Sequence, residues 1–277
     1  MKPAWSEQFD ADALRPVEAL KLQQPITKEW AWGDSTGSGV KVAIIDSGVE
    51  VGHPAVGDIA GGIAIEYDPD EETLVRLVEG PHEDLFGHGT ACAGIIRTVA
   101  PDCEIYSVRV LGERLTGKGI VFAAGLRWCI DNQMNVVNLS LSSGKRDHFD
   151  LFHELADEAY FQNVMLVSAV NNVPKPSYPS LYSSVFSVAS HERKDPFSLD
   201  YNPSPPVEFG APGIDVEVAW SGGSRCLATG NSFAAPHIAG LVTRILGKHR
   251  GLTPFEVKTI LRSVADNADR TTKSGPA

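Results

Sequence analysis

Short apolar, β-branched runs alternate along this chain with segments of helical periodicity. The run VKVAIID at residues 40–46 is the clearest, and similar runs lie at residues 104–110, 135–141, 164–170 and 184–190. Such nearly continuous apolar strands are typical of parallel sheets that are buried on both faces. Apolar residues at helical spacing predict helices over residues 119–131, 149–162, 232–246 and 252–264.

This alternation predicts a single three-layer α/β domain, in which a mostly parallel sheet carries helices on both faces. The length of 277 residues fits one large domain, and the chain has no internal repeat or low-complexity linker. We expect residues 1–35 to form an N-terminal arm packed on the domain. Residues 36–268 then form the domain itself, and residues 269–277 form a flexible tail.

The composition excludes several classes of partner. A formal net charge of −11 argues against nucleic acid and against an anionic membrane surface. No apolar stretch approaches the roughly 18 residues that span a bilayer, and the N-terminus lacks the apolar core of a secretory signal. The four cysteines have no C-x-x-C spacing; they are Cys92, Cys103, Cys129 and Cys226. We therefore expect reduced thiols and a cytoplasmic location.

Two of the expected helices carry position-specific signals. Thr253 and Glu256 have the spacing of a capping box, with Pro254 at the first helical position. In the segment 232–246, Pro236 is expected in about the first turn, where a missing N–H costs least.

Polar residues stand where strands end or helices begin, which is where sites form in parallel sheets. Asp46 closes the first strand, His88 lies between two glycines, Ser232 opens a helix of small residues, and Asn171 follows another strand. Each has an ordinary structural reading, as a loop cap, a structural histidine, a helix N-cap or a turn residue. Together they give the chain order Asp, His, Ser, which is one of the known orders of a serine-protease triad.

The chain resembles the subtilisin-like serine proteases, the subtilase family. The resemblance rests on VAIIDSGVEVGHP, GHGTACAG, VNLSLSS and TGNSFAAPHIAGLV, and it extends from about residue 30 to about residue 265. It implies a compact, intracellular-type catalytic domain, because the stretch before Asp46 is too short for both a signal and a folding pro-segment.

The resemblance also implies a role for each motif residue. Ser232 is the nucleophile, His88 the general base, and Asp46 the residue that orients the imidazole. Asn171 supplies the amide of the oxyanion hole, together with the backbone N–H of Ser232. The segment Ser140, Leu141 and Ser142 pairs with an extended substrate.

Several residues depart from the usual family pattern. Val170 precedes Asn171 where the family has glycine, and a β-branched residue tolerates a positive φ poorly. Asn231 and Phe233 replace the threonine and methionine that usually flank the serine. Ser142 is expected to narrow the primary specificity pocket, and Gly119 to open a more distal one. Ser177 is expected near the base of the primary pocket and is uncharged. This predicts a preference for an uncharged, small-to-medium residue before the cleaved bond.

No metal or cofactor is expected. Only the segment IIRT, residues 95–98, joins GHGTACAG to the next strand, whereas many bacterial relatives have a calcium-binding loop there. The acidic run YDPDEE at residues 67–72 is interpreted as a solvated loop rather than a cation site.

These observations predict a serine endopeptidase of narrow specificity that hydrolyses an intracellular peptide or protein precursor through an acyl-enzyme. A regulatory partner is one way in which such an enzyme would be restrained. Two alternatives remain open. One is a peptide-binding module with a detuned site, for which Val170 and Asn231 are the only support. The other is a transpeptidase that uses the same acyl-enzyme.

Overall fold

The computed structural model describes residues 26–204 and 206–268. The expected tail at residues 269–277 and most of the expected N-terminal arm lie outside these residues. Within the remainder of the arm, helix α1 (Lys28–Ala31) lies against the end of a later helix: Lys248 donates a hydrogen bond to the Glu29 carbonyl, and Trp30 stacks on His249.

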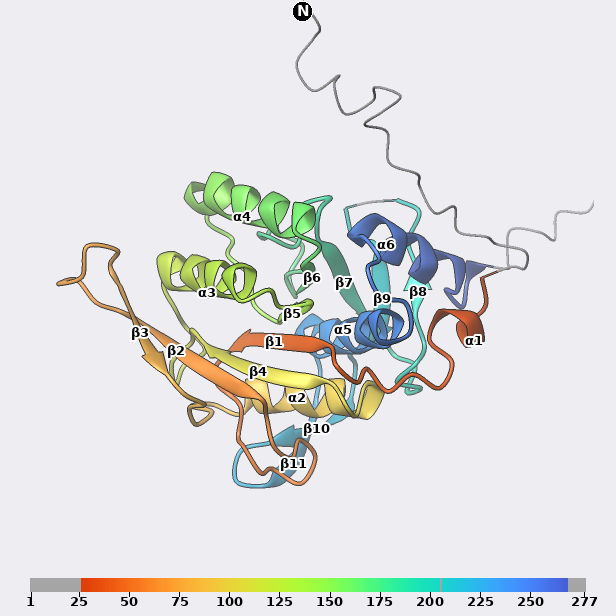
Figure 1. The fold of residues 1–277 in the computed structure, drawn as a ribbon, viewed down its shortest axis with the longest axis horizontal. Coiled ribbons are helices and arrows are strands. Elements are labelled where there is room, and N and C mark those ends of the chain that lie inside the picture. Colours follow the sequence, from red (N-terminus) through yellow and green to blue (C-terminus); the bar gives the residue numbers. More distant parts are fainter. Residues whose placement is uncertain (1–25, 205, 269–277) are drawn as a thin grey trace, which may run out of the picture.

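The centre of the fold is a nine-stranded sheet in the order β3-β2-β4-β1-β5-β6-β7-β9-β8 (Figure 1). The seven strands from β2 to β9 are parallel, and the edge strands β3 and β8 are antiparallel to their neighbours. The strands are β1 (Lys41–Asp46), β2 (Gly61–Tyr67), β3 (Val75–Glu79), β4 (Glu104–Arg109), β5 (Val136–Leu139), β6 (Met165–Ala169), β7 (Phe186–His191), β8 (Asp200–Tyr201) and β9 (Phe209–Pro212).

Helices cover both faces of this sheet. Helices α3 (Gly119–Asp131) and α4 (Phe149–Phe161) pack on one face, while α2 (His88–Val99) and α5 (Asn231–Lys248) pack on the other (Figure 1). The remaining elements are a 3₁₀ turn (Arg146–His148), helix α6 (Pro254–Ser263) and a separate hairpin of β10 (Val216–Trp220) and β11 (Ser224–Ala228).

The alternation of side chains along β1 shows why its sequence is apolar at almost every position. Val42 and Ile44 belong to the core cluster under α2 and α5, whereas Ala43 and Ile45 belong to the cluster under α3 and α4. All four side chains are buried. The predicted single α/β domain with a mostly parallel sheet is therefore confirmed, as is the capping box of Thr253 at the start of α6.

The position of Pro236 corrects an expectation. Helix α5 begins at Asn231, so Pro236 lies in its second turn rather than near its start. Proline has no N–H to donate to the carbonyl four residues earlier, which is that of Ser232. The hydroxyl of Ser140 donates to this carbonyl instead, at 2.7 Å. Pro236 thus frees an acceptor through which the end of β5 is joined to the first turn of α5.

His237, the next residue of α5, gives a prediction about acid stability. It is buried and its Nδ1 bonds to the Phe233 carbonyl at 2.9 Å. Burial, with a smaller effect of His191, lowers its pKa from 6.5 to about 4. Between these pH values the unfolded chain binds a proton that the folded protein does not. The free energy of unfolding therefore decreases as the pH is lowered through this range, by up to about 3 kcal/mol. Urea unfolding measured at a series of pH values from 7 to 4.5 should show a steeper loss of unfolding free energy for the wild type than for His237→Gln. Equal dependence on pH in the two proteins would contradict this assignment.

Candidate active site

Asp46 lies at the carboxyl end of β1 and is completely buried. Its Oδ2 lies 2.8 Å and its Oδ1 3.0 Å from His88 Nδ1. The backbone N–H of Ser47 donates a further hydrogen bond to Oδ1 at 2.8 Å. A buried carboxylate needs such partners to offset its desolvation, and here the imidazole is one of them.

His88 is the first residue of α2, and the glycines on both sides of it have identifiable roles. Gly87 has a φ of +110°, which a residue with a side chain rarely adopts. A Cβ on Gly89 would lie 2.0 Å from the carbonyl oxygen of Gly48, so glycine lets α2 approach the loop after β1. This close approach brings the imidazole to Asp46.

Charge around His88 sets its protonation. Burial disfavours the imidazolium, but the Asp46 carboxylate, its hydrogen bond and the more distant Asp84 together outweigh this effect. The pKa of His88 therefore lies above its ordinary value. This environment favours a ring that accepts a proton during a reaction.

Asp84 is a positioning residue that the sequence did not single out. Its Oδ1 accepts hydrogen bonds from Ser47 Oγ at 2.7 Å and from the backbone N–H of Gly87 at 2.8 Å. Its Oδ2 accepts from the backbone N–H and the hydroxyl of Thr90, at 2.8 and 2.7 Å. A carboxylate at a helix N-terminus also interacts favourably with the helix dipole. Asp84 thereby fixes the turn that carries His88.

Ser232 is the second residue of α5 and is partly exposed. Within residues 26–268 the structure shows no acceptor for its backbone N–H, as expected in the first turn of a helix. It also shows no hydrogen bond between Ser232 Oγ and His88 among the described residues. Bonds of this kind are often long without substrate and tighten when it binds.

Cys92 connects the histidine side of the site to the serine side. One turn along α2 from His88, its Sγ lies 3.9 Å from Asp46 Oδ2, 3.2 Å from Ser140 Oγ and 3.8 Å from the Ser232 carbonyl. The sequence had indicated only a reduced thiol at this position. Asp46, His88 and Cys92 could also hold a metal ion by their proximity. Burial raises the pKa of the Cys92 thiol well above its usual value.

The two adjacent asparagines, Asn171 and Asn172, differ in their contacts. The Asn171 Oδ1 accepts a hydrogen bond from the Val173 N–H at 3.0 Å, so this side chain is part of a local turn. The Asn172 Oδ1 instead accepts from the Asn231 N–H, at 2.8 Å. A Cβ built on Gly230 would lie 3.3 Å from Ser232 Oγ and 3.5 Å from Asn172 Nδ2, so the hydroxyl and this amide nitrogen flank one small space.

Asn231 has a structural role that explains its place before Ser232. Its Nδ2 donates to the carbonyls of Val170 and Asn171, both at 3.2 Å, and its Oδ1 accepts from the Ser190 N–H at 2.9 Å. It therefore holds the segment after β6 against the start of α5. Val170 is not among the described residues with positive φ, so its β-branched side chain causes no strain of that kind.

The predicted substrate-binding residues fall in three places. Ser140, Leu141 and Ser142 line a cavity of about 210 Å³ together with both asparagines, Asn171 and Asn172, and with Ser232. Ser177 does not line it, because its buried hydroxyl is bonded to the Asn171 N–H and to Ser180 Oγ. Gly119 lines a second, larger cavity that shares Leu141 and Ser142 with the first.

The short segment after α2 is held by a side-chain cation. The Arg97 guanidinium donates hydrogen bonds to four backbone carbonyls: those of Val56 at 3.0 Å, Asp58 at 2.9 Å, Pro101 at 2.7 Å and Cys103 at 2.6 Å. It thus ties the segment before β2 to the turn before β4. The acidic run at residues 67–72 lies in the connection between β2 and β3.

Comparison with known proteins shows the family to which the chain belongs. Residues 37–275 match the profile of the Subtilase family. The chain is 30% identical to the subtilisin of Bacillus pumilus over 83% of its own length and 85% of that protein's. It is also 30% identical to the minor extracellular protease Epr and to subtilisin E of Bacillus subtilis, over 86% and 83% of its length. A solved cold-adapted subtilisin-like serine proteinase superposes with a TM-score of 0.67 at 27% identity, covering 84% of this chain and 86% of the other.

The chain spans 37% of the length of Epr and 61% of that of subtilisin E. Within the described residues, none of the helices has the length and apolar character needed to cross a membrane.

Proposed function

Because the chain belongs to the subtilase family, we propose that it is a serine endopeptidase that works through an acyl-enzyme. The observation that carries this proposal is the buried Asp46–His88 pair beside a serine in the first turn of α5. The hydroxyl of Ser232 attacks the peptide carbonyl, and His88 takes its proton and later gives it to the leaving amine. Asp46 holds Nδ1 of the ring, so that Nε2 is the nitrogen that accepts this proton.

The developing oxyanion is bound by two donors. One is the backbone N–H of Ser232, which lies at the positive end of the α5 dipole. The other is Asn172 Nδ2, which is oriented because its Oδ1 accepts from the Asn231 N–H. Water then hydrolyses the acyl-enzyme. The substrate lies as an extended strand along residues 140–142, whose side chains line the cavity at Ser232.

We also propose a reducing compartment and narrow specificity. All four cysteines are free thiols, three of them buried, which supports a cytoplasmic setting. The cavity beside Ser232 is small, at about 210 Å³, and no charged side chain lines it. This lining supports an uncharged, small-to-medium residue before the cleaved bond.

Labelling with a fluorophosphonate tests the activated serine. Intact-mass spectrometry in the presence of EDTA is expected to show a single adduct on the wild type. Ser232→Ala removes the nucleophile and His88→Ala removes the base, so neither should be labelled. A folded wild type that stays unlabelled would contradict the proposal and favour a peptide-binding module. Repeating the reaction with cell lysate would then detect an enzyme that depends on a partner.

A further inference from the structure

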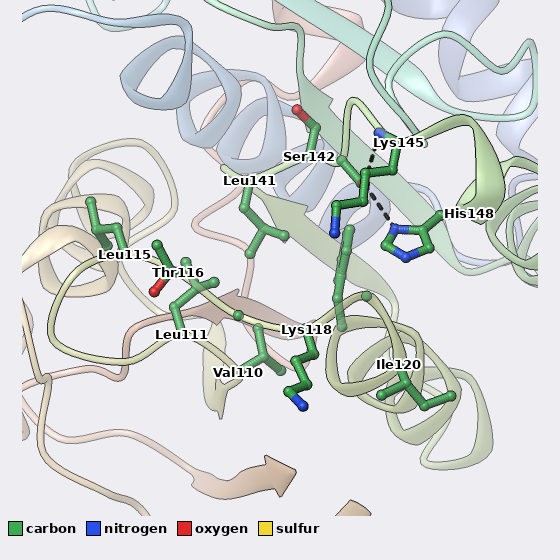
Figure 2. A pocket seen from close by; sticks show the side chains of 14 residues that line it. Val110, Leu111, Leu115, Thr116, Lys118, Ile120, Leu141, Ser142, Lys145 and His148 are labelled. Carbon is green, nitrogen blue, oxygen red and sulfur yellow. Dashed lines mark hydrogen bonds between the residues drawn. The ribbon is translucent and has the colours of Figure 1, made fainter. Parts of the chain in front are cut away.

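A cavity of about 650 Å³ adjoins the one at Ser232, and Leu141 and Ser142 line both. Figure 2 shows it enclosed by the loop after β4, the start of α3 and the segment after β5. Much of its wall is apolar, from side chains that include Leu111, Ile120 and Phe122. A peptide extended along residues 140–142 therefore passes this cavity, which has room for a large side chain.

The side chains of this cavity that carry a permanent charge are both lysines. Lys118, Lys145 and His148 line it, and no aspartate or glutamate is among its lining residues. This contrasts with the whole chain, which has 35 acidic and 24 basic residues. The acidic residues nearest in sequence, Glu113 and Asp147, belong to the same loops but do not line the cavity.

The two lysines of the cavity differ in their contacts within the protein. The Lys118 ammonium lies 3.1 Å from the centre of the Tyr67 ring, over its face. Lys145 forms no ion pair with any described carboxylate. In Figure 2 its ammonium points into the space between Leu141 and His148. An apolar cavity that holds an unpaired cation is complementary to a side chain with an aliphatic stem and a carboxylate.

His148 is fixed beside Lys145. Its Nδ1 lies 2.9 Å from Ser143 Oγ, and the same oxygen accepts the backbone N–H of Lys145 at 3.2 Å. Its ring also occupies the space next to Gly119, because a Cβ on that glycine would lie 2.1–2.6 Å from three ring atoms. Glycine at position 119 therefore admits the imidazole to the wall of the cavity.

We propose that this cavity selects peptides with an acidic side chain at one position, and that Lys145 and His148 are its specificity-determining residues. The inference rests on the proposed function for the path of the substrate along residues 140–142. Side chains of an extended peptide alternate between two faces, so a single register should present the carboxylate to Lys145.

Binding and hydrolysis of a peptide set test the inference. Each decapeptide of the set carries a single glutamate among otherwise uncharged residues, and the position of the glutamate changes from one peptide to the next. In the matched control, glutamine replaces the glutamate. Binding is measured by fluorescence anisotropy on full-length Ser232→Ala, and kcat/KM on the wild type. We expect one register in which glutamate is favoured over glutamine about fivefold, the upper range for a solvent-accessible ion pair. This ratio should shrink in 0.5 M salt.

Substitutions assign the preference to its source. Lys145→Met should reduce the ratio of glutamate to glutamine towards one, and Lys145→Glu should invert it. Arg114→Met is the matched control, because Arg114 lies on the loop after β4 but does not line the cavity; it should keep the ratio of the wild type.

The outcomes separate this inference from the proposed function. Peptides that bind or are cleaved without a glutamate preference, or with an equal preference at every position, would overturn the inference alone. Selective binding by Ser232→Ala without hydrolysis by the wild type would support the inference and overturn the proposed activity. Failure to bind any peptide would overturn both.

Discussion

Replacing Asn172 by alanine is expected to lower kcat by about 10²–10³-fold, the loss known for the corresponding donor in subtilisin. Asn172 Nδ2 and Ser232 Oγ flank the same small space, and the Asn231 N–H fixes the carboxamide. The amide would bind the oxyanion more strongly than the ground-state carbonyl, so KM should change little. Steady-state kinetics on a neutral peptide measures the two constants separately.

Asn171→Ala is the matched control for this prediction. It removes the same side chain one residue earlier, where Oδ1 bonds only to the Val173 N–H of its own turn. We expect a loss of less than tenfold. A larger loss for Asn171→Ala than for Asn172→Ala would show that the assignment from the motif was right and the assignment from the contacts wrong.

The two adjacent asparagines show what the sequence could not decide. Both follow an apolar strand, and both have the residue type that an oxyanion amide requires. The choice depends on where β6 ends, at Ala169, and on the contact with Asn231, which lies 59 residues further along the chain. Such a long-range contact leaves no signal within the motif itself. Cys92 was missed for the same reason, since its partners lie on β1, directly after β5 and on α5. Asp84 has local partners in Gly87 and Thr90, but its contact with Ser47 in the loop after β1 is also long-range.

The fold was predictable where strands are buried on both faces. In β1 and β5 nearly every residue is buried, so the apolar run is continuous and easily recognised. Strand β3 of the β2–β3 hairpin and strand β11 of the β10–β11 hairpin expose most of their residues and have no such run. Their pairing is set by turns and by cross-strand contacts, which a search for apolar runs does not detect. The motif glycines around His88 were informative because the backbone at Gly87 and Gly89 excludes other residues.

Arg97→Met is expected to destabilise the protein by about 3 kcal/mol, which corresponds to a Tm lower by roughly 6–12 °C for a domain of this size. The substitution keeps much of the aliphatic stem but leaves four carbonyls without their charged donor, two of them on the buried residues Val56 and Cys103. Differential scanning calorimetry measures the shift. EDTA should leave the Tm of the wild type unchanged, because a guanidinium and not an exchangeable ion joins these segments.

Arg76→Met provides the control, since Arg76 is an exposed arginine that pairs with Glu66 across the β2–β3 hairpin. An exposed ion pair contributes little, so this variant should melt close to the wild type. Arg97→Lys keeps the charge but offers a single ammonium to carbonyls on two segments. Its Tm should therefore lie between that of Arg97→Met and that of the wild type. An Arg97→Met variant as stable as the wild type would show that Arg97 does not hold this junction. A Tm that drops in EDTA would show that a bound cation also contributes to stability. The predicted order of the three variants follows from the planar guanidinium, whose several donors can bind carbonyls on both segments at once.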